Sequence, residues 1–345
     1  MKKIQIYKNK ITNNSKPYMI VEACVNHQGN FKIAKKMIFA AKKAGAQCIK
    51  FQHHIIKEEM LEKNIPKSKN FTKSLAQVIE ETNFTLKQHK QLKKICEKNK
   101  IDYLCTPFSI QAARELNEIG VKAFKTGSGE LTNFPFIHYL ASLKKPMIVS
   151  TGMSTVEEID ETVKIIKKFN TPLALMHCVS AYPCPNKIMN LNFIQYLSNK
   201  YNIPVGLSDH TSSIYNALGA VSLGAQLIEK HFTFDKKLPG PDHKSSIDEK
   251  ELKDLIKGIE ANYLARGNEK KIFREEREII AWARESIVTK KDIKKGEILS
   301  KNNITTKRPT AKKNQLSAKL FYKILGKRIK KDIKIDNILK HEDIL

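Results

Sequence analysis

Lysine and hydroxyl side chains stand at the ends of several short apolar segments of this chain. The set comprises Lys50, Thr106, Lys125, Ser128, Ser150 and Ser208. Lys125 opens the stretch Lys-Thr-Gly-Ser-Gly-Glu, in which glycines let backbone N–H groups approach an anion closely. A Gly-Ser-Gly element alone is a common turn. Together with two lysines and four hydroxyls, it predicts a site for a phosphate and a carboxylate.

Two histidines occupy matching places at the ends of two successive apolar segments. His210 ends Gly-Leu-Ser-Asp-His, and His231 ends Glu-Lys-His. Neutral ring nitrogens on neighbouring strands suit Mn²⁺, Mg²⁺, Co²⁺ or Zn²⁺, with water and substrate oxygens completing the coordination. One such histidine is more often an ordinary buried polar residue, but the pair predicts a metal site. Asp209 is expected to orient an imidazole or to bind the metal through water.

The positions of the other histidines indicate a functional role less clearly. His177 is either a core residue or a substrate contact, and His243 is left open. The helical or tail segments around His89, His138 and His341 predict surface positions for them.

A repeated pattern has to position these residues. Apolar segments alternate with amphipathic helical stretches and span residues 18–25, 47–52, 102–107, 123–127, 146–151, 172–178, 203–208 and 226–232. Continuous apolar strands joined through helices predict a parallel sheet. Eight such units predict a (β/α)8 barrel, in which chemistry gathers at the carboxyl ends of the strands. An open doubly wound sheet is the alternative, but Gly-x-Gly-x-x-Gly does not follow the first strand.

Composition narrows the class of protein. The 345 residues allow one large domain and one small domain. The formal net charge of +27 makes a basic nucleic-acid-binding protein the non-enzyme alternative, but lysine is interleaved with acidic residues and no nucleic-acid motif is present. No apolar run approaches the ~20 residues of a membrane span, and no signal peptide is recognisable. Six cysteines without C-x-x-C spacing predict reduced, mostly buried thiols in a cytoplasmic protein.

Short motifs along the whole chain resemble, in the same order, those of the sialic acid synthase (N-acetylneuraminate synthase) family. They are Asn26-His-Gln-Gly, Lys50-Phe-Gln, Cys105-Thr-Pro-Phe, Lys125-Thr-Gly-Ser-Gly-Glu, Val149-Ser-Thr-Gly-Met, Tyr182-Pro-Cys-Pro, Gly206-Leu-Ser-Asp-His, Glu229-Lys-His-Phe and Gly240-Pro-Asp. The resemblance implies a (β/α)8 barrel followed by a small SAF domain, similar to type III antifreeze protein. It also implies metal-dependent condensation of phosphoenolpyruvate with an N-acylated hexosamine. N-acetylmannosamine is the expected sugar, and N-acetylneuraminate, a precursor of lipopolysaccharide or capsule, is the expected product.

The resemblance assigns roles to individual residues. Phosphoenolpyruvate would be held by the six lysine and hydroxyl residues named above. Glu130, Glu22 and Lys50 would be catalytic, with Glu130 handling the proton of the attacking water. His210 and His231 would hold the metal, expected to be Mn²⁺, with Mg²⁺ or Co²⁺ as alternatives. The sugar would be contacted by Glu22, Gln52, Tyr182, Glu229 and Asp242.

The sequence pattern indicates a second domain independently of the family resemblance. Charged residues dominate 266–277, and a new pattern begins with Ser286-Ile-Val-Thr. The predicted division is a barrel over 1–270, a linker over 271–284 and a SAF domain over 285–345. A domain of this size has a marginal core and is expected to dock against something. The resemblance implies a domain-swapped homodimer in which Arg308 contacts the sugar's N-acyl group in the partner's barrel; an ordinary surface arginine is the alternative.

The identity of the sugar is the open question. Phe51-Gln-His-His-Ile and Glu58-Glu-Met resemble the acetylneuraminate branch, whereas the start Lys-Phe-Gln is shared with the legionaminic branch. The alternative is therefore a legionaminate or pseudaminate synthase that uses a 6-deoxy di-N-acetylated hexose. A related condensation on a sugar phosphate would need a further phosphate site, which the sequence does not show.

Overall fold

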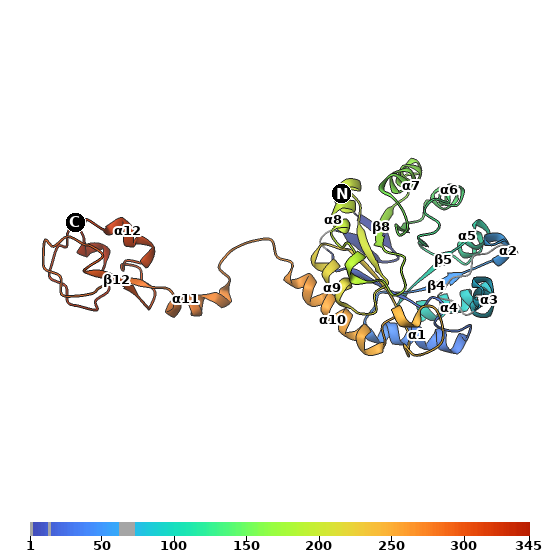
Figure 1. Cartoon of the computed structure of the whole chain (residues 1–345), viewed down its shortest axis with the longest axis horizontal. Helices are drawn as coiled ribbons and strands as arrows, with labels where there is room; N and C mark the ends of the chain where they lie inside the picture. Colours follow the sequence, from blue (N-terminus) through green and yellow to red (C-terminus); the bar gives the residue numbers. More distant parts are fainter. Residues whose placement is uncertain (1–2, 13–14, 62–72) are drawn as a thin grey trace. The chain divides into compact units, whose positions relative to one another are not determined.

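The computed structural model divides the chain into two compact units, Met1–Gly267 and Asn268–Leu345 (Figure 1). It describes residues 3–12, 15–61 and 73–345. No helix of these described residues is long and apolar enough to cross a membrane.

Eight parallel strands form the centre of the first unit. They are β3 (Tyr18–Glu22), β4 (Cys48–His53), β5 (Asp102–Pro107), β6 (Phe124–Thr126), β7 (Met147–Ser150), β8 (Leu173–Cys178), β9 (Val205–Asp209) and β10 (Leu227–His231). The sheet order is β5-β4-β3-β10-β9-β8-β7-β6, and β5 and β6, at its two ends, contact each other. The sheet is therefore a nearly closed barrel, which confirms the predicted fold class.

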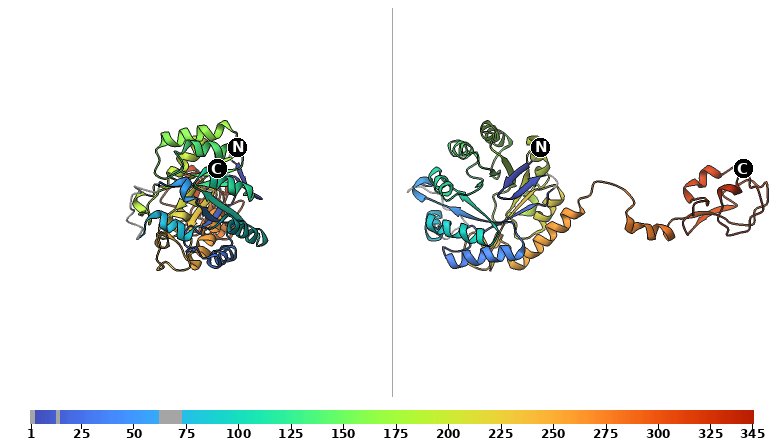
Figure 2. Two further views of the ribbon diagram at one scale, coloured as in Figure 1. Left: turned by 90° about the vertical axis from the view of Figure 1, so that its right-hand side faces the viewer. Right: turned by 180° about the vertical axis from the view of Figure 1, so that it is seen from behind.

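Helices cover the outside of the barrel (Figure 2). They are α1 (Phe31–Ala44), α4 (Leu86–Lys98), α5 (Ile110–Glu118), α6 (Phe134–Ser142), α7 (Val156–Lys168), α8 (Phe193–Tyr201), α9 (Tyr215–Ser222) and α10 (Glu249–Ala265), with α2 (Ile56–Glu59) and α3 (Leu75–Thr82) between β4 and α4. Several begin with capping boxes, such as Thr85 with Gln88 and Thr155 with Glu158, which satisfy the first free N–H groups of the helix. Two short 3-10 turns, Asn186–Ile188 and His243–Ser245, lie in the loops after β8 and β10.

The amino-terminal end of the barrel is closed by a hairpin that the sequence analysis did not predict. Its strands are β1 (Lys3–Ile6) and β2 (Asn9–Thr12). Ile4, Ile6 and Ile11 are buried in the same cluster as the barrel's interior residues, which include Ile20 and Ile148. Because the hairpin and this cluster fill the amino-terminal end, ligands have to enter at the carboxyl ends of the strands.

The second unit has its own small core. Its elements are the 3-10 turn Arg274–Glu276, α11 (Arg277–Ala283), β11 (Ser286–Thr289), β12 (Ile304–Lys307), the 3-10 turn Ala318–Leu320, α12 (Phe321–Ile324) and the 3-10 turn His341–Asp343. The strands β11 and β12 pair antiparallel. Buried aliphatic side chains, among them Ile287, Leu316 and Leu339, form the core.

Candidate active site

The carboxyl ends of the barrel strands surround a cavity of about 500 Å³, here called the mouth cavity. All the barrel residues to which the family resemblance assigned a role line it: Glu22, Lys50, Gln52, Thr106, Lys125, Ser128, Glu130, Ser150, Tyr182, Ser208, His210, Glu229, His231 and Asp242. The structure therefore brings together residues from all eight strands or the loops that follow them. Arg308, the remaining predicted residue, lies in the second unit.

Strand alternation decides which side chains face this cavity. On β10, Glu229 and His231 face inwards, whereas Lys230 between them turns outwards. The Lys230 ammonium lies 3.0 Å from the Asp209 carboxylate of β9, and both side chains are fully buried. The expectation that Asp209 orients an imidazole or binds the metal is therefore wrong, because alternation turns it away from the mouth cavity.

Two lysines and two glutamates form a buried ionic cluster at the base of the cavity. The Lys50 ammonium pairs with Glu22 and lies 3.7 Å from Glu229 Oε1, and the Lys125 ammonium lies 3.6 Å from the same oxygen. Burial disfavours the charged form of both Lys50 and Glu229, but neighbouring groups of opposite charge outweigh this effect. Glu22 and Glu229 raise the pKa of Lys50, and the two lysines lower the pKa of Glu229. Burial, with the charge of Glu229, raises the pKa of Glu22 despite Lys50. An anion that binds here has to replace carboxylate contacts of the lysines.

Hydroxyl groups extend the cationic cluster. Lys50 Nζ donates to Thr106 Oγ1 at 3.2 Å, and Lys125 Nζ donates to Ser150 Oγ at 2.6 Å. Ser128 Oγ accepts from the Gly152 N–H at 3.1 Å. These hydroxyls lie beside the ammonium groups and can donate to further oxygens of a phosphate or carboxylate.

The two histidines lie side by side at the mouth. Their ring centroids are 5.3 Å apart and the rings are inclined by 74°. His210 Nδ1 lies 3.0 Å from the Val179 carbonyl oxygen, which can only accept, so Nδ1 carries the proton and Nε2 presents its lone pair. Nε2 lies 3.2 Å from the Tyr182 hydroxyl. Burial lowers the pKa of His231 well below its ordinary range, so this imidazole is neutral.

A group of potential metal ligands surrounds His231. Its Nδ1 is buried and finds no hydrogen-bond partner among the described residues. Ligand atoms of His231, Asp242 and Cys24 all lie within 4.8 Å of one another. A neutral nitrogen without a partner beside a carboxylate fits a divalent cation. The residues present thus suit a metal next to the cationic cluster.

Glu130 has an environment unlike that of the other carboxylates. Its side chain is partly exposed, but Oε2 is buried and unpartnered within the described chain. Burial raises its pKa to about 7. A side chain at Gly127 would displace the Glu130 carboxylate from its present position. Glu130 can therefore accept or release a proton near neutral pH.

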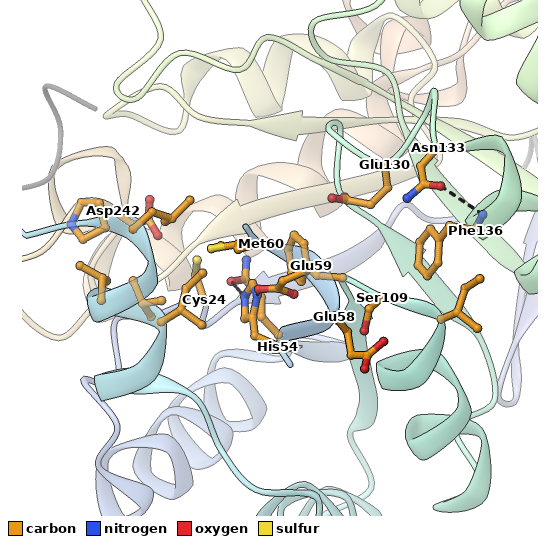
Figure 3. Close-up of a pocket in the computed structure, with 18 residues that line it drawn as sticks. Cys24, His54, Glu58, Glu59, Met60, Ser109, Glu130, Asn133, Phe136 and Asp242 are labelled. Carbon is orange, nitrogen blue, oxygen red and sulfur yellow. Dashed lines mark hydrogen bonds and ion pairs between the residues drawn. The ribbon is translucent and has the colours of Figure 1, made fainter. Parts of the chain in front are cut away.

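A second cavity of about 590 Å³ adjoins the mouth cavity, and Figure 3 shows its lining. Both cavities are lined by Cys24, Gln52, Leu75, Phe108, Glu130 and Asp242. The second one, here called the side cavity, has an apolar wall of Val25, Leu75, Val78, Ile79, Phe108 and Phe136, and polar side chains such as His54, Glu58 and Asn133 line the rest. It can accept an apolar substituent of a ligand held at the mouth.

His54 and Glu59 support this region, although the sequence analysis gave neither a role. His54 Nδ1 lies 2.8 Å from Glu59 Oε1, Nε2 lies 3.2 Å from Gln52 Oε1, and the ring stacks on Phe108 with centroids 4.0 Å apart. These contacts fix the Gln52 amide. His54 stands two residues after Gln52, and strand periodicity, which places such residues on one face, was the signal that could have identified it.

The remaining histidines are structural or exposed. His89 is fully buried on the inner side of α4, with Nδ1 2.8 Å from the Tyr103 hydroxyl, so its predicted surface position is wrong. His177 Nε2 lies 2.6 Å from the Met189 carbonyl oxygen, which favours the core role. His243 Nδ1 lies 2.7 Å from Thr233 Oγ1. His138 and His341 are exposed.

Arg308 follows β12 in the second unit. Its side chain is exposed, and the guanidinium carbon lies 5.6 Å from the centroid of the Trp282 ring. This contact holds the arginine against α11.

Comparisons with known proteins agree with this architecture. The NeuB family model matches residues 37–271, and the SAF domain model matches residues 284–345. An N,N'-diacetyllegionaminic acid synthase of Campylobacter jejuni is 41% identical over 334 residues, covering 94% of this chain and 99% of that protein. The human N-acetylneuraminate-9-phosphate synthase is 29% identical over 331 residues, covering 94% and 92%.

Among solved structures, an N-acetylneuraminic acid synthetase from Leptospira borgpetersenii superposes with a TM-score of 0.73 and 34% identity. The match covers 81% of this chain and 95% of that one. The family model alone spans more than half of the chain. This chain belongs to the NeuB family, carries a SAF domain, and is a phosphoenolpyruvate-dependent condensing enzyme of the sialic acid synthase type.

Proposed function

We propose that the chain joins phosphoenolpyruvate to the open-chain form of an N-acylated hexosamine, giving a nine-carbon sialic acid and phosphate. The observation that carries this proposal is the convergence of Lys50 and Lys125, with their hydroxyl neighbours, beside His210 and His231. One side of the mouth cavity thus suits an anion, and the histidine side would suit a metal and the carbonyl group of the sugar.

Phosphoenolpyruvate occupies the cationic side in this proposal. Lys50, Thr106, Lys125, Ser128, Ser150 and Ser208 hold its phosphate and carboxylate. The two ammonium groups lie 3.7 and 3.6 Å from one oxygen of Glu229, so both can reach a single bound anion. Ser208 Oγ, which donates to Glu229 at 3.0 Å, can turn to the ligand. Charge-assisted hydrogen bonds of this kind are roughly twice as strong as neutral ones.

His210 and His231 would hold a divalent metal, with Mn²⁺ expected and Mg²⁺ or Co²⁺ as alternatives. When bound there, such an ion acts as a Lewis acid towards the sugar's aldehyde oxygen. Glu22, Gln52, Tyr182, Glu229 and Asp242 position the sugar's hydroxyl groups. Tyr182 stacks on His210 with centroids 4.1 Å apart, and the His54–Glu59 pair supports Gln52. The sugar is therefore held between the imidazoles and the side cavity.

The reaction makes one carbon–carbon bond and one carbon–oxygen bond, and it breaks the carbon–oxygen bond that joins carbon 2 to the phosphate. Carbon 3 of phosphoenolpyruvate attacks the aldehyde carbon, and the aldehyde oxygen takes up a proton. Water adds to carbon 2 and passes one proton to Glu130, which replaces the proton that the aldehyde oxygen took up. The bond between carbon 2 and the phosphate oxygen then breaks, carbon 2 becomes a carbonyl, and the released phosphate takes the second proton of the water. A pKa of about 7 suits Glu130 to this transfer. Glu22 and Lys50 hold phosphoenolpyruvate in place beside the sugar. This positioning speeds the reaction because it lowers the entropic part of the barrier.

The second unit completes the site in a domain-swapped homodimer. Arg308 would reach the partner's barrel and contact the sugar's N-acyl group. Its exposed guanidinium supports this role, as do exposed apolar side chains in the part of the second unit that precedes β11, namely Ile272, Phe273, Ile279 and Trp282. An exposed apolar group of this kind favours burial against a partner. We place the reaction in the cytoplasm, because all six cysteines are unpaired and buried within the described chain.

Two sugars are candidates for the acceptor. N-acetylmannosamine would give N-acetylneuraminate, in line with the similarity to the Leptospira synthetase. A 6-deoxy di-N-acetylated hexose would give legionaminate or pseudaminate, and two observations favour it. The Campylobacter legionaminic acid synthase is 41% identical over 94% of this chain, and the apolar wall of the side cavity suits a methyl group better than a hydroxyl.

The deciding experiment incubates the full-length protein with phosphoenolpyruvate, Mn²⁺ and a panel of both sugar types. Phosphate release is measured, and the product is identified by its mass. A nonulosonic acid product from either sugar supports the proposal and names the acceptor. Absence of phosphate release with every sugar, together with salt-dependent retention of nucleic acid in a gel shift, would instead favour the nucleic-acid-binding alternative.

A further inference from the structure

The turn after β3 places a cysteine beside the expected metal. Cys24 lines both the mouth cavity and the side cavity, and its side chain is buried. Figure 3 shows Cys24 and Asp242 on the same side of the pocket. Ligand atoms of Cys24, Asp242 and His231 lie within 4.8 Å of one another, in the range expected for donors that share one cation.

Two observations independent of the thiol point to a ligand at this place. His231 is 5% exposed, and its Nδ1 lacks a hydrogen-bond partner in the described ranges. The nearest Asp242 oxygen lies 3.9 Å from Nδ1, too far for a hydrogen bond. A buried nitrogen and a buried carboxylate that approach without bonding leave room for an ion between them.

The backbone of Cys24 is held in an unusual conformation. Its φ of 42° lies in the left-handed region, which glycine adopts more readily than cysteine. Its N–H donates to Glu22 Oε1 at 2.6 Å, and this bond fixes the turn. A residue with a side chain persists in such a conformation where the surroundings enforce it, often at functional sites.

We propose that Cys24 is a further ligand of the metal, so that the cation is bound by a thiolate and the Asp242 carboxylate in addition to imidazole. The proposal rests on the metal-dependent function proposed above. On binding, the sulfur–hydrogen bond is replaced by a sulfur–metal bond, and the proton leaves to solvent. No electron is transferred. A thiolate favours Zn²⁺ and Co²⁺ over Mn²⁺ and Mg²⁺, which prefer oxygen ligands. Cys24 thereby shifts the metal preference of this enzyme.

The test uses the metal-free full-length protein titrated with Co²⁺ and read by absorption. A thiolate ligand gives a near-ultraviolet charge-transfer band, which nitrogen and oxygen ligands alone do not give. We expect the band in the wild type and its loss in Cys24→Ser. We also expect Co²⁺ affinity to fall by at least about tenfold, the lower end of losses seen when even outer-shell partners of a metal are removed. Mn²⁺ affinity should fall less, so the ratio of the two affinities changes.

Two further variants make the test decisive. Cys24→Gly suits the positive φ and keeps the test valid if the serine variant does not fold; it should also lack the band. Cys178→Ser is the matched control, because its sulfur lies 3.8 Å from His210 Nδ1, and it should keep the band.

Loss of the band in Cys178→Ser alone, or unchanged spectra and affinities in both Cys24 variants, overturns this inference. Metal-dependent phosphate release in the same preparations would then leave the proposed function standing. Full activity in chelator would instead refute the metal dependence itself.

Discussion

The half-buried carboxyl of Glu130 allows a quantitative test by the substitution Glu130→Gln. Glutamine keeps the shape of the side chain but cannot ionise. Burial raises the pKa of Glu130 from an ordinary 4.5 to about 7. Since one pKa unit corresponds to about 1.4 kcal/mol, the folded state disfavours the charged form by about 3 kcal/mol.

The sign of the pH dependence follows from proton linkage. Between pH 4.5 and about 7, the folded protein holds a proton on Glu130 that the unfolded chain has released. The stability contributed by this group is therefore fully present below pH 4.5 and is lost as the pH rises to about 7. Relative to the wild type, Glu130→Gln should gain about 3 kcal/mol of unfolding free energy across that interval.

Urea unfolding at a series of pH values, followed by far-ultraviolet circular dichroism, measures this difference. The matched control is Glu80→Gln, which makes the same chemical change on an exposed side chain of α3. Phosphate release in the same samples should fall by about 10²–10⁴-fold in Glu130→Gln, the usual contribution of a general acid or base. A stability difference that stays constant with pH refutes the reasoning about burial. Wild-type turnover by Glu130→Gln refutes its role with water.

Four further outcomes are expected. Chelation with EDTA should abolish phosphate release, and added Mn²⁺ should restore it. Equilibrium dialysis should find weaker metal binding in His231→Ala than in the wild type. Full activity in the presence of the chelator would contradict the metal site. Lys125→Met should raise the KM for phosphoenolpyruvate by about 10- to 100-fold, because a charge-assisted hydrogen bond contributes about 1.5–3 kcal/mol; an unchanged KM contradicts the anion site. Arg308→Ala should raise the KM for the sugar or lower kcat while the KM for phosphoenolpyruvate stays constant, and no change in either sugar parameter removes its role. Light scattering should show a dimer; a fully active monomer is incompatible with domain exchange.

The fold could be predicted from the sequence because its signals are local. Each barrel strand is a run of apolar residues, since helices cover one face of the sheet and the barrel interior covers the other. Capping residues such as Thr85 and Thr155 mark helix starts over a few positions. The hairpin β1–β2 was missed because its strands have only four residues each and β2 contains a single apolar residue, Ile11, so the alternation typical of a strand is too short to recognise.

Contacts within the site depended on side-chain direction and could be predicted only in part. Asp209 was expected at the metal and Lys230 stands between two predicted site residues, yet these two pair with each other, buried on the face of the barrel wall that is turned away from the mouth cavity. His89 lies on a helix with many lysines, which indicated a surface position, but its face of α4 packs inwards. In each case the decisive fact is the face on which a residue lies. A shift of one position reverses that face on a strand and turns it by about 100° on a helix.

The sequence by itself determined the family, the order of strands and helices, and the residue types at the strand ends, because these follow from local patterns and motif spacing. Only the tertiary structure decided which of those residues share a cavity. It also brought Cys24 to His231 and Asp242, and it set the raised pKa of Glu130. The physical reason is that proximity and burial arise from contacts between distant segments. A carboxyl group's charge and a nitrogen's free lone pair depend on those contacts, not on the neighbours along the chain.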